Sequence, residues 1–222
     1  MLTQAIEDYV KAIYKLQREG QPVTTTAIAA RMGVAAPSAS NMIKKLARLR
    51  LVEHTPYHGV VLTSGGEKIA LEVIRHHRLL ELYLSQHLGV GLDRLHDEAE
   101  RLEHVLSEDL EEKIAAALGE PTRDPHGDPI PSRQGAVDDR PYPLLAELKE
   151  GEHGVIARVS DQDPRVLRDL AGEGLLPGAR VRVVDVDEDG TVRLQGDAGE
   201  RKVPRRLAEA VYVTARGGSR RS

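Results

Sequence analysis

The chain has 222 residues, a length that favours two or three small domains over one large core. It contains no Cys, which excludes disulfide bonds and thiolate-bound zinc, so any metal ion must be held by nitrogen and oxygen ligands. The net charge of −4 is unevenly distributed: residues 1–64 hold eight Lys or Arg against four Asp or Glu, and residues 65–118 hold six against twelve. This asymmetry is typical of a nucleic-acid-binding part joined to a cation-binding part.

The N-terminus shows no targeting segment. Its first residues include acidic side chains and lack the apolar core of a signal peptide. No apolar run approaches the length of about 20 residues that spans a membrane. We therefore expect a soluble cytoplasmic protein without a membrane partner.

The first 50 residues predict three helices. Apolar residues recur with helical period from Ile6 to Leu16, Thr24–Thr26 can cap a second helix, and Gly33-Val34 makes a tight turn. The third segment, 36–46, carries Pro37 in its first turn, where a missing N–H donor is tolerated. This layout is typical of a helix-turn-helix, whose second helix reads bases with its N-terminal residues while the cations that follow contact phosphate. A plain three-helix packing unit remains the alternative.

A β-hairpin should follow these helices. The runs 51–53 and 60–63 flank Thr55-Pro56-Tyr57-His58-Gly59, a sequence typical of a hairpin turn. Three helices followed by a hairpin predict a winged helix-turn-helix DNA-binding domain over residues 1–64.

Two long helices are predicted next, at 64–87 and 92–118. At 100° per residue, four side chains able to bind a divalent cation fall within about a third of the second helix's circumference. They are His96, Glu100, Glu103 and His104. A further pair, His77 and Glu81, has i,i+4 spacing on the preceding helix, so two antiparallel helices could share metal ions. The alternative is a solvated face on which such pairs only stabilise the helix.

The same region carries more apolar surface than one surface helix needs to bury. This surplus predicts a homodimer, which would place two DNA-binding domains on a palindromic site in double-stranded DNA. The apolar residues concerned are Leu79, Leu80, Leu82, Tyr83 and Leu88. Residues 65–143 are therefore interpreted as a helical dimerisation and metal-binding domain. Their last part, Gly119–Pro143, is rich in Pro, Gly and Asp and is interpreted as a linker.

The C-terminal part changes to short β-like runs at 154–159, 180–186, 191–194 and 211–213, interrupted by a short helix at 164–172. We expect a small five-stranded barrel over residues 144–214 and a disordered tail over 215–222. The fold class is thus mainly α with a small β domain.

The order of these parts resembles the diphtheria toxin repressor family of metal-dependent transcriptional regulators. The resemblance covers nearly the whole chain and rests on the motifs HRLLE at 77–81, HDEAERLEH at 96–104, DPIP at 128–131 and GLLPG at 174–178. It implies that the C-terminal barrel is SH3-like, as in FeoA domains. It also implies a regulator that represses metal-uptake genes when metal is bound, and not an enzyme.

The resemblance implies two metal sites. The primary one joins Asp8 to Glu100, Glu103 and His104, and the second joins His77, Glu81 and His96 to an acidic residue of the barrel, with Asp163 as the best match and Asp161 close behind. In the iron-responsive branch the positions of Asp8 and Glu100 are usually Met and Cys. Two carboxylates there resemble the manganese branch, because hard oxygen ligands favour Mn²⁺. The expected cofactor is Mn²⁺, with Fe²⁺ as the alternative.

One departure from that branch concerns Lys11, because some manganese regulators with a paired-metal site have Glu there. A cation at this position argues against that two-metal cluster. On the DNA side, the resemblance implies that Pro37, Ser38, Ser40 and Asn41 face the operator, and Lys44 and Lys45 follow as phosphate contacts. Two other functions remain open: a metallohydrolase using the His/Glu cluster, and a winged-helix regulator that needs no metal.

Overall fold

The computed structural model describes residues 3–20, 23–55, 59–138, 140–160, 163–196 and 199–216. The chain forms two compact units. The first unit consists of Met1–His77, Arg101–Glu111 and Pro131–Val137. The second unit consists of Arg78–Glu100, Glu112–Ile130 and Asp138–Ser222. None of the helices in the described ranges is long and apolar enough to cross a membrane.

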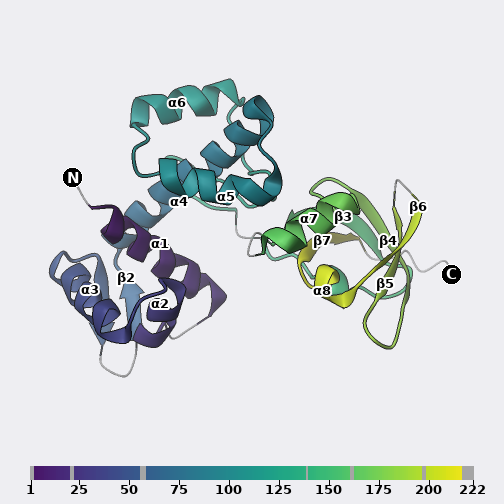
Figure 1. The fold of residues 1–222 in the computed structure, drawn as a ribbon, viewed down its shortest axis with the longest axis horizontal. Helices are drawn as coiled ribbons and strands as arrows, with labels where there is room; N and C mark the ends of the chain where they lie inside the picture. Colours follow the sequence, from purple (N-terminus) through teal and green to yellow (C-terminus); the bar gives the residue numbers. More distant parts are fainter. Residues whose placement is uncertain are drawn as a thin grey trace. The chain divides into compact units, whose positions relative to one another are not determined.

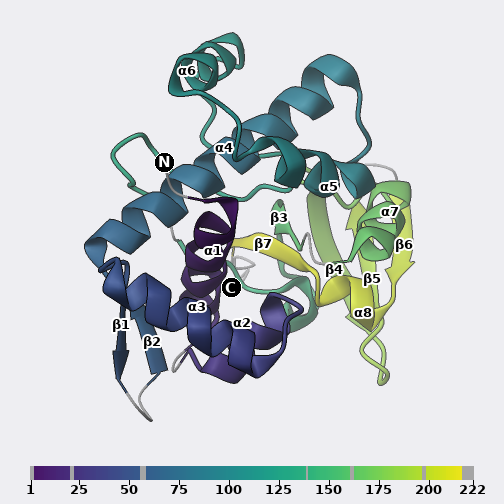
Figure 2. The same cartoon turned by 60° about the vertical axis from the view of Figure 1, so that its left-hand side comes forward.

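The first unit begins with the predicted winged helix (Figures 1 and 2). Its helices are α1 (Gln4–Glu19), α2 (Thr25–Arg31) and α3 (Ala36–Arg48), and its hairpin consists of β1 (Val52–Thr55) and β2 (Gly59–Leu62). The strands pair antiparallel from Val52 opposite Leu62 to Thr55 opposite Gly59. The turn residues 56–58 lie outside the described residues.

One apolar core holds the winged helix together, and the sequence specifies its elements locally. Residues spaced three and four apart on α1 and α3 face this core, among them Ile6, Val10, Ile13, Ile43 and Leu46. The Thr24 hydroxyl accepts the Ala27 N–H at 3.1 Å and caps α2, and Pro37 lies in the first turn of α3. Because α1 and α3 share one core, a force that positions α1 also positions α3.

The helical middle consists of α4 (Ser64–Leu88), α5 (Leu92–Leu102) and α6 (Glu108–Ala117). The predicted helix over 92–118 is therefore wrong as a single element: α5 ends at Leu102, and a turn at residues 103–105 leads into α6. The α6 helix restarts at Ser107, whose hydroxyl accepts the Leu110 N–H at 3.3 Å. Glu103 and His104 thus lie in a corner and not on the face of a continuous helix.

The apolar residues from which a homodimer was predicted differ in exposure. Leu79, Leu80 and Leu82 are buried within one chain, whereas Leu88 is 63% exposed. Around the corner between α5 and α6, Val105 is 77% exposed and Leu110 is 49% exposed. Leu79, Leu80 and Leu82 therefore contribute to the interior of one chain, and these exposed apolar side chains lie near the ends of the helices.

The C-terminal sheet belongs to the second unit and has the order β6-β5-β4-β3-β7, with every pair antiparallel. Its strands are β3 (His153–Val159), β4 (Arg180–Val186), β5 (Val192–Gly196), β6 (Gly199–Val203) and β7 (Val211–Arg216). The 3-10 turn η1 (Leu145–Glu147) precedes the sheet, and α7 (Pro164–Gly172) and α8 (Arg205–Ala208) pack on it (Figure 1). The expected five-stranded domain is confirmed, although the run that forms β6 was missed. The tail residues 217–222 lie outside the described residues.

The interpretation of Gly119–Pro143 as a linker is wrong for its central part. Residues 123–129 form a compact turn in which the Asp124 carboxylate accepts the N–H groups of His126 and Asp128 at 2.8 and 2.9 Å. The His126 carbonyl accepts the Val159 N–H of β3 at 2.9 Å. Gly127 has φ +88°, and a Cβ at this position would lie 2.1 Å from the Ala157 carbonyl oxygen. This loop is therefore docked against the C-terminal end of β3, at residues 157–159.

Candidate metal centre and nucleic-acid interface

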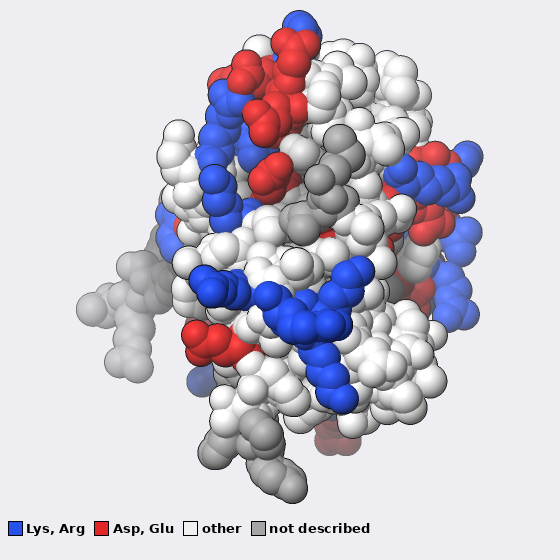
Figure 3. Space-filling model, turned by 90° about the vertical axis from the view of Figure 1, so that its left-hand side faces the viewer, with Lys and Arg blue, Asp and Glu red and all other residues white. Residues whose placement is uncertain are grey.

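The N-terminal part of α3 presents the residues predicted to contact DNA. Pro37, Ser38 and Asn41 are exposed and Ser40 is half-buried. Lys44 and Lys45 follow on the exposed side of the same helix. The face of the molecule on the α3 side of Figure 1 carries a cluster of Lys and Arg side chains (Figure 3). Small polar groups followed by cations suit a helix that enters a groove and pairs with phosphate.

Three of the four predicted primary-site residues meet in the first unit. Asp8 comes from α1, and Glu103 and His104 come from the corner after α5. Each offers a ligand atom within 4.8 Å of the others. Glu103 is 1% exposed, so its carboxylate is fully shielded from water. Glu100 is half-buried on α5 and belongs to the other unit.

The Glu103 carboxylate is surrounded by groups that can carry a proton. Lys11 Nζ donates to both of its oxygens, at 2.7 and 2.8 Å. His77 Nδ1 lies 2.5 Å from Oε2, and His104 Nε2 lies 3.3 Å from Oε1. Lys11 is itself buried, at 5% exposed. The position that the sequence identified as a departure from the manganese branch therefore pairs directly with a proposed metal ligand.

His104 is held between two acidic residues of α1. Its Nδ1 lies 2.7 Å from Glu7 Oε2, which fixes the ring and directs Nε2 toward Asp8. His104 Nε2 and Asp8 Oδ1 lie 2.8 Å apart, but without hydrogen-bond geometry. Two buried polar atoms that converge without a hydrogen bond between them fit a cation placed between them.

The donor set is chemically consistent with a divalent metal. Two carboxylates and one imidazole are borderline to hard ligands that suit Mn²⁺, Fe²⁺ and Zn²⁺, and no thiolate is present to select softer ions. Glu7 lies behind His104, where a carboxylate can orient the imidazole of a histidine that binds a metal ion. The residues at this site therefore fit one divalent cation.

A second group of ligand-type side chains lies in the other unit; the sequence reasoning named its Glu81 as a ligand but missed Asp124 and His126. Glu81 of α4 meets Asp124 and His126 of the docked loop, and all three are buried. His126 Nδ1 lies 3.7 Å from Glu81 Oε2, and His96 Nδ1 lies 4.0 Å from Glu81 Oε1. The available signal was a His and two Asp in close sequence within a stretch that was interpreted as a linker.

The pKa of Asp124 is raised to about 7, mainly by burial and then by the negative charges of Asp128 and Glu81. Arg78 and His126 oppose this shift. Arg78 Nε lies 3.6 Å from the Asp124 carboxylate, and the guanidinium also donates to the Pro129 carbonyl at 2.5 Å. A carboxyl that is buried beside two other carboxylates is one that a bound cation would stabilise in its ionised form.

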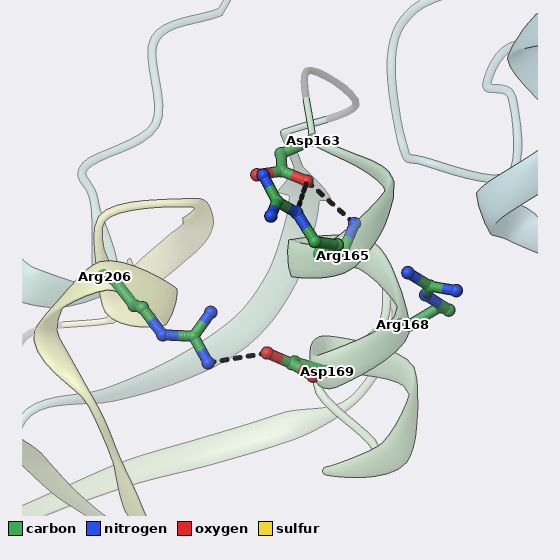
Figure 4. Close-up of a pocket in the computed structure, with 5 residues that line it drawn as sticks. All are labelled: Asp163, Arg165, Arg168, Asp169 and Arg206. Carbon is green, nitrogen blue, oxygen red and sulfur yellow. Dashed lines mark hydrogen bonds and ion pairs between the residues drawn. The ribbon is translucent and has the colours of Figure 1, made fainter.

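Asp163, the residue predicted to complete the second site, has another contact. Its Oδ1 accepts the Arg165 N–H at 2.8 Å, which caps α7 and lowers the pKa of this carboxyl. It lines an open pocket of about 590 Å³ with Arg165, Arg168, Asp169 and Arg206 (Figure 4). Within the described ranges it belongs to none of the groups of three or more ligand-type side chains. Asp161 lies outside the described residues.

Three domain families match the chain in tandem. The N-terminal DNA-binding domain of iron-dependent repressors matches residues 1–60, their metal-binding and dimerisation domain matches 63–132, and the FeoA domain matches 144–215. The iron-dependent repressor IdeR of Mycobacterium bovis is 31% identical over 96% of this chain and 97% of its own length. The diphtheria toxin repressor of Corynebacterium efficiens is 35% identical over 96% of both chains.

The chain is also similar to solved structures of metal-dependent repressors. A structure described as a manganese-dependent transcriptional repressor in complex with manganese is 41% identical, covers 95% of this chain and 99% of its own, and has a TM-score of 0.88. A structure of ScaR with bound Zn²⁺ is 33% identical over 94% of this chain and 98% of its own, with a TM-score of 0.76.

Proposed function

The chain belongs to the family of iron-dependent repressors that includes the diphtheria toxin repressor, and from that premise we propose that it is a Mn²⁺-activated repressor whose activating metal binds Asp8, Glu103 and His104. The family makes it a metal-dependent, DNA-binding transcriptional regulator with a dimerisation domain. The identity of the metal, the ligands and the palindromic operator belong to the proposal.

The convergence of α1 with the corner after α5 carries this proposal. Asp8 and His104 come from segments almost a hundred residues apart, yet their ligand atoms lie 2.8 Å apart. A bound cation would supply the positive charge that keeps the carboxylates of Asp8 and Glu103 close together in ionised form. The absence of sulfur from this set supports Mn²⁺ over metals that prefer softer ligands.

The effect on DNA follows from the core that α1 shares with α3. Ligands at Asp8 and at the corner would tie α1 to residues 103–104, and the apolar core that contains Val10, Ile13 and Ile43 would transmit that position to α3. If this arrangement binds the operator best, metal tightens DNA binding and DNA tightens metal binding by the same factor. A coupling of about 1–3 kcal/mol corresponds to about a 5- to 150-fold change in operator affinity.

We propose Glu81, Asp124 and His126 as a second metal site. The complete burial of these three side chains and the raised pKa of Asp124 support it. The assignments of His77, His96, Glu100 and Asp163 as further ligands remain predictions. For Asp163, the capping contact with Arg165 supports the other interpretation.

We propose a homodimer on a palindromic operator. The exposed Val105 and Leu110 at the corner between α5 and α6 support a pairing surface, and the Pro37–Lys45 side of α3 supports groove contact. The relatives are repressors and not enzymes, so we propose no catalytic role for the His/Glu clusters.

Isothermal titration of the metal-free protein with Mn²⁺ tests the site directly. Asp8→Ala should remove one binding event, whereas Glu19→Ala, a change at an exposed carboxylate on the same helix, should leave it unchanged. An operator can be obtained by selecting duplexes from a random library in the presence of Mn²⁺. Unaltered Mn²⁺ binding by Asp8→Ala would reject the site.

A further inference from the structure

A buried polar network adjoins the proposed primary metal site without containing any of its ligand atoms. It consists of Arg75 and His76 of α4 and Glu111 of α6, which are 8%, 6% and 5% exposed. Glu111 Oε1 accepts Arg75 Nε at 2.6 Å, and Glu111 Oε2 lies 3.1 Å from His76 Nε2. Each carboxylate oxygen is thus engaged by a different residue of α4.

The network reaches the metal site through one backbone atom. His76 Nδ1 lies 3.2 Å from the carbonyl oxygen of Glu103. This carbonyl follows the last residue of α5, where helical acceptors lose their partners and need a substitute donor. His76 supplies that donor, and the chain turns there instead of continuing as a helix.

The chemistry of the contacts gives His76 a defined orientation. A backbone carbonyl only accepts hydrogen bonds, and so does an ionised carboxylate, so both ring nitrogens face acceptors. Arg75 Nε donates to the other oxygen of Glu111, Oε1, at 2.6 Å and holds the carboxylate in place. The ring is therefore fixed at both ends, by Glu111 on one side and by the corner on the other.

We propose that Glu111 is a positioning residue of the primary metal site, acting through His76 on the Glu103 carbonyl so that Glu103 and His104 face Asp8. This inference rests on the proposed function. Rotation of the corner about the Glu103 backbone would change the directions of both side chains together. Residues behind metal ligands typically change metal affinity about 10- to 100-fold when removed.

The test compares Mn²⁺ affinity, measured by isothermal titration, across four variants. Glu111→Ala and His76→Ala should each weaken binding at the Asp8 site by about 10- to 100-fold. In the double variant the two losses should not add, because one residue acts through the other. The same double-mutant cycle on urea unfolding of the metal-free protein should show coupling between the two residues. Glu108→Ala, an exposed carboxylate on the same helix, should bind Mn²⁺ as the wild type does.

Arg75→Leu separates positioning from general stability. It removes the contacts of Arg75 with Glu111 and with the Pro131 carbonyl, at 2.8 Å, but leaves the His76 contacts in place. It should therefore lower stability while Mn²⁺ affinity changes little. If Arg75→Leu weakened Mn²⁺ binding as much as Glu111→Ala, or if the losses were additive, the inference would be overturned.

The proposed function and this inference fail in different ways. If Asp8→Ala abolishes binding but Glu111→Ala and His76→Ala bind Mn²⁺ normally, only the positioning role is wrong. If Asp8→Ala binds normally, the site itself is wrong. Should Glu111→Ala not fold, Glu111→Gln keeps one acceptor oxygen and serves the same comparison, with a smaller loss of affinity expected.

Discussion

Replacing Lys11 by Met tests whether the Lys11 ammonium group compensates the charge of the buried Glu103 carboxylate when metal is absent. The two side chains are both buried, and Nζ lies 2.7 and 2.8 Å from the carboxylate oxygens. Met has a similar length and no charge, so the substitution removes the cation without opening a large cavity. Among the residues that the structure describes, His77 and His104 then remain beside Glu103 as groups that can carry a proton.

The expected loss of stability follows from the burial of this pair. Removing one partner of a buried ion pair typically destabilises a protein by about 3–5 kcal/mol, because the remaining charge is uncompensated. Mn²⁺ would restore a cation beside Glu103. A ligand at 100 times its Kd adds about 2.7 kcal/mol. Since Lys11 and the metal repel each other, Mn²⁺ should bind Lys11→Met about tenfold more tightly or better, and so should stabilise it more than it stabilises the wild type.

Urea unfolding of both proteins, with and without saturating Mn²⁺, measures these changes. Lys15→Met, one turn further along α1, controls for loss of a lysine from that helix. The reasoning would be refuted if metal-free Lys11→Met were as stable as the wild type, or if Mn²⁺ stabilised both by the same amount.

Three further predictions concern selectivity, pH and DNA. Asp8→Met should shift preference from Mn²⁺ toward metals that favour sulfur, and an unaltered ranking in a metal panel would contradict the selectivity argument. Because the folded-state pKa of Asp124 is about 7, above its ordinary 3.8, stability of the metal-free protein should fall as pH rises from about 4 to 7 through this group. Asp124→Asn should remove that loss, so at pH 8 the metal-free variant should be more stable than the wild type by up to roughly 4 kcal/mol. Equal urea midpoints of the two proteins at pH 8 would contradict this prediction. Lys44→Ala should weaken Mn²⁺-dependent operator binding and reduce its salt slope by about one; an unchanged slope would exclude a phosphate contact.

The winged helix could be predicted from the sequence because its signals are local. Helical spacing on α1, the Thr24 cap and Pro37 in the first turn of α3 each act within a few residues. The strand β6 was missed because Gly199–Val203 is mostly charged. It lies at the edge of the sheet, where alternate side chains face water and only Val203 is fully buried.

The corner at Glu103 and the docked loop depend on long-range contacts. No residue near position 103 has a low enough helix propensity to end a helix. At this turn the Glu103 carbonyl oxygen contacts Nδ1 of His76, which lies 27 positions away in the sequence. The loop around His126 has the composition of a linker, but Arg78 and Arg158 neutralise its acidic residues and β3 binds its backbone. The metal-site residues Asp8, Glu103 and His104 could be named from motif resemblance, whereas Asp124 and His126 required the folded chain.

The most direct test of the central claim is operator binding measured by fluorescence anisotropy, with and without Mn²⁺, for the wild type and Asp8→Ala at equal protein concentration. The coupling through α1 predicts that Mn²⁺ tightens binding by the wild type about 5- to 150-fold and leaves Asp8→Ala at the metal-free level. Equal operator affinity of the wild type with and without Mn²⁺ would contradict the claim.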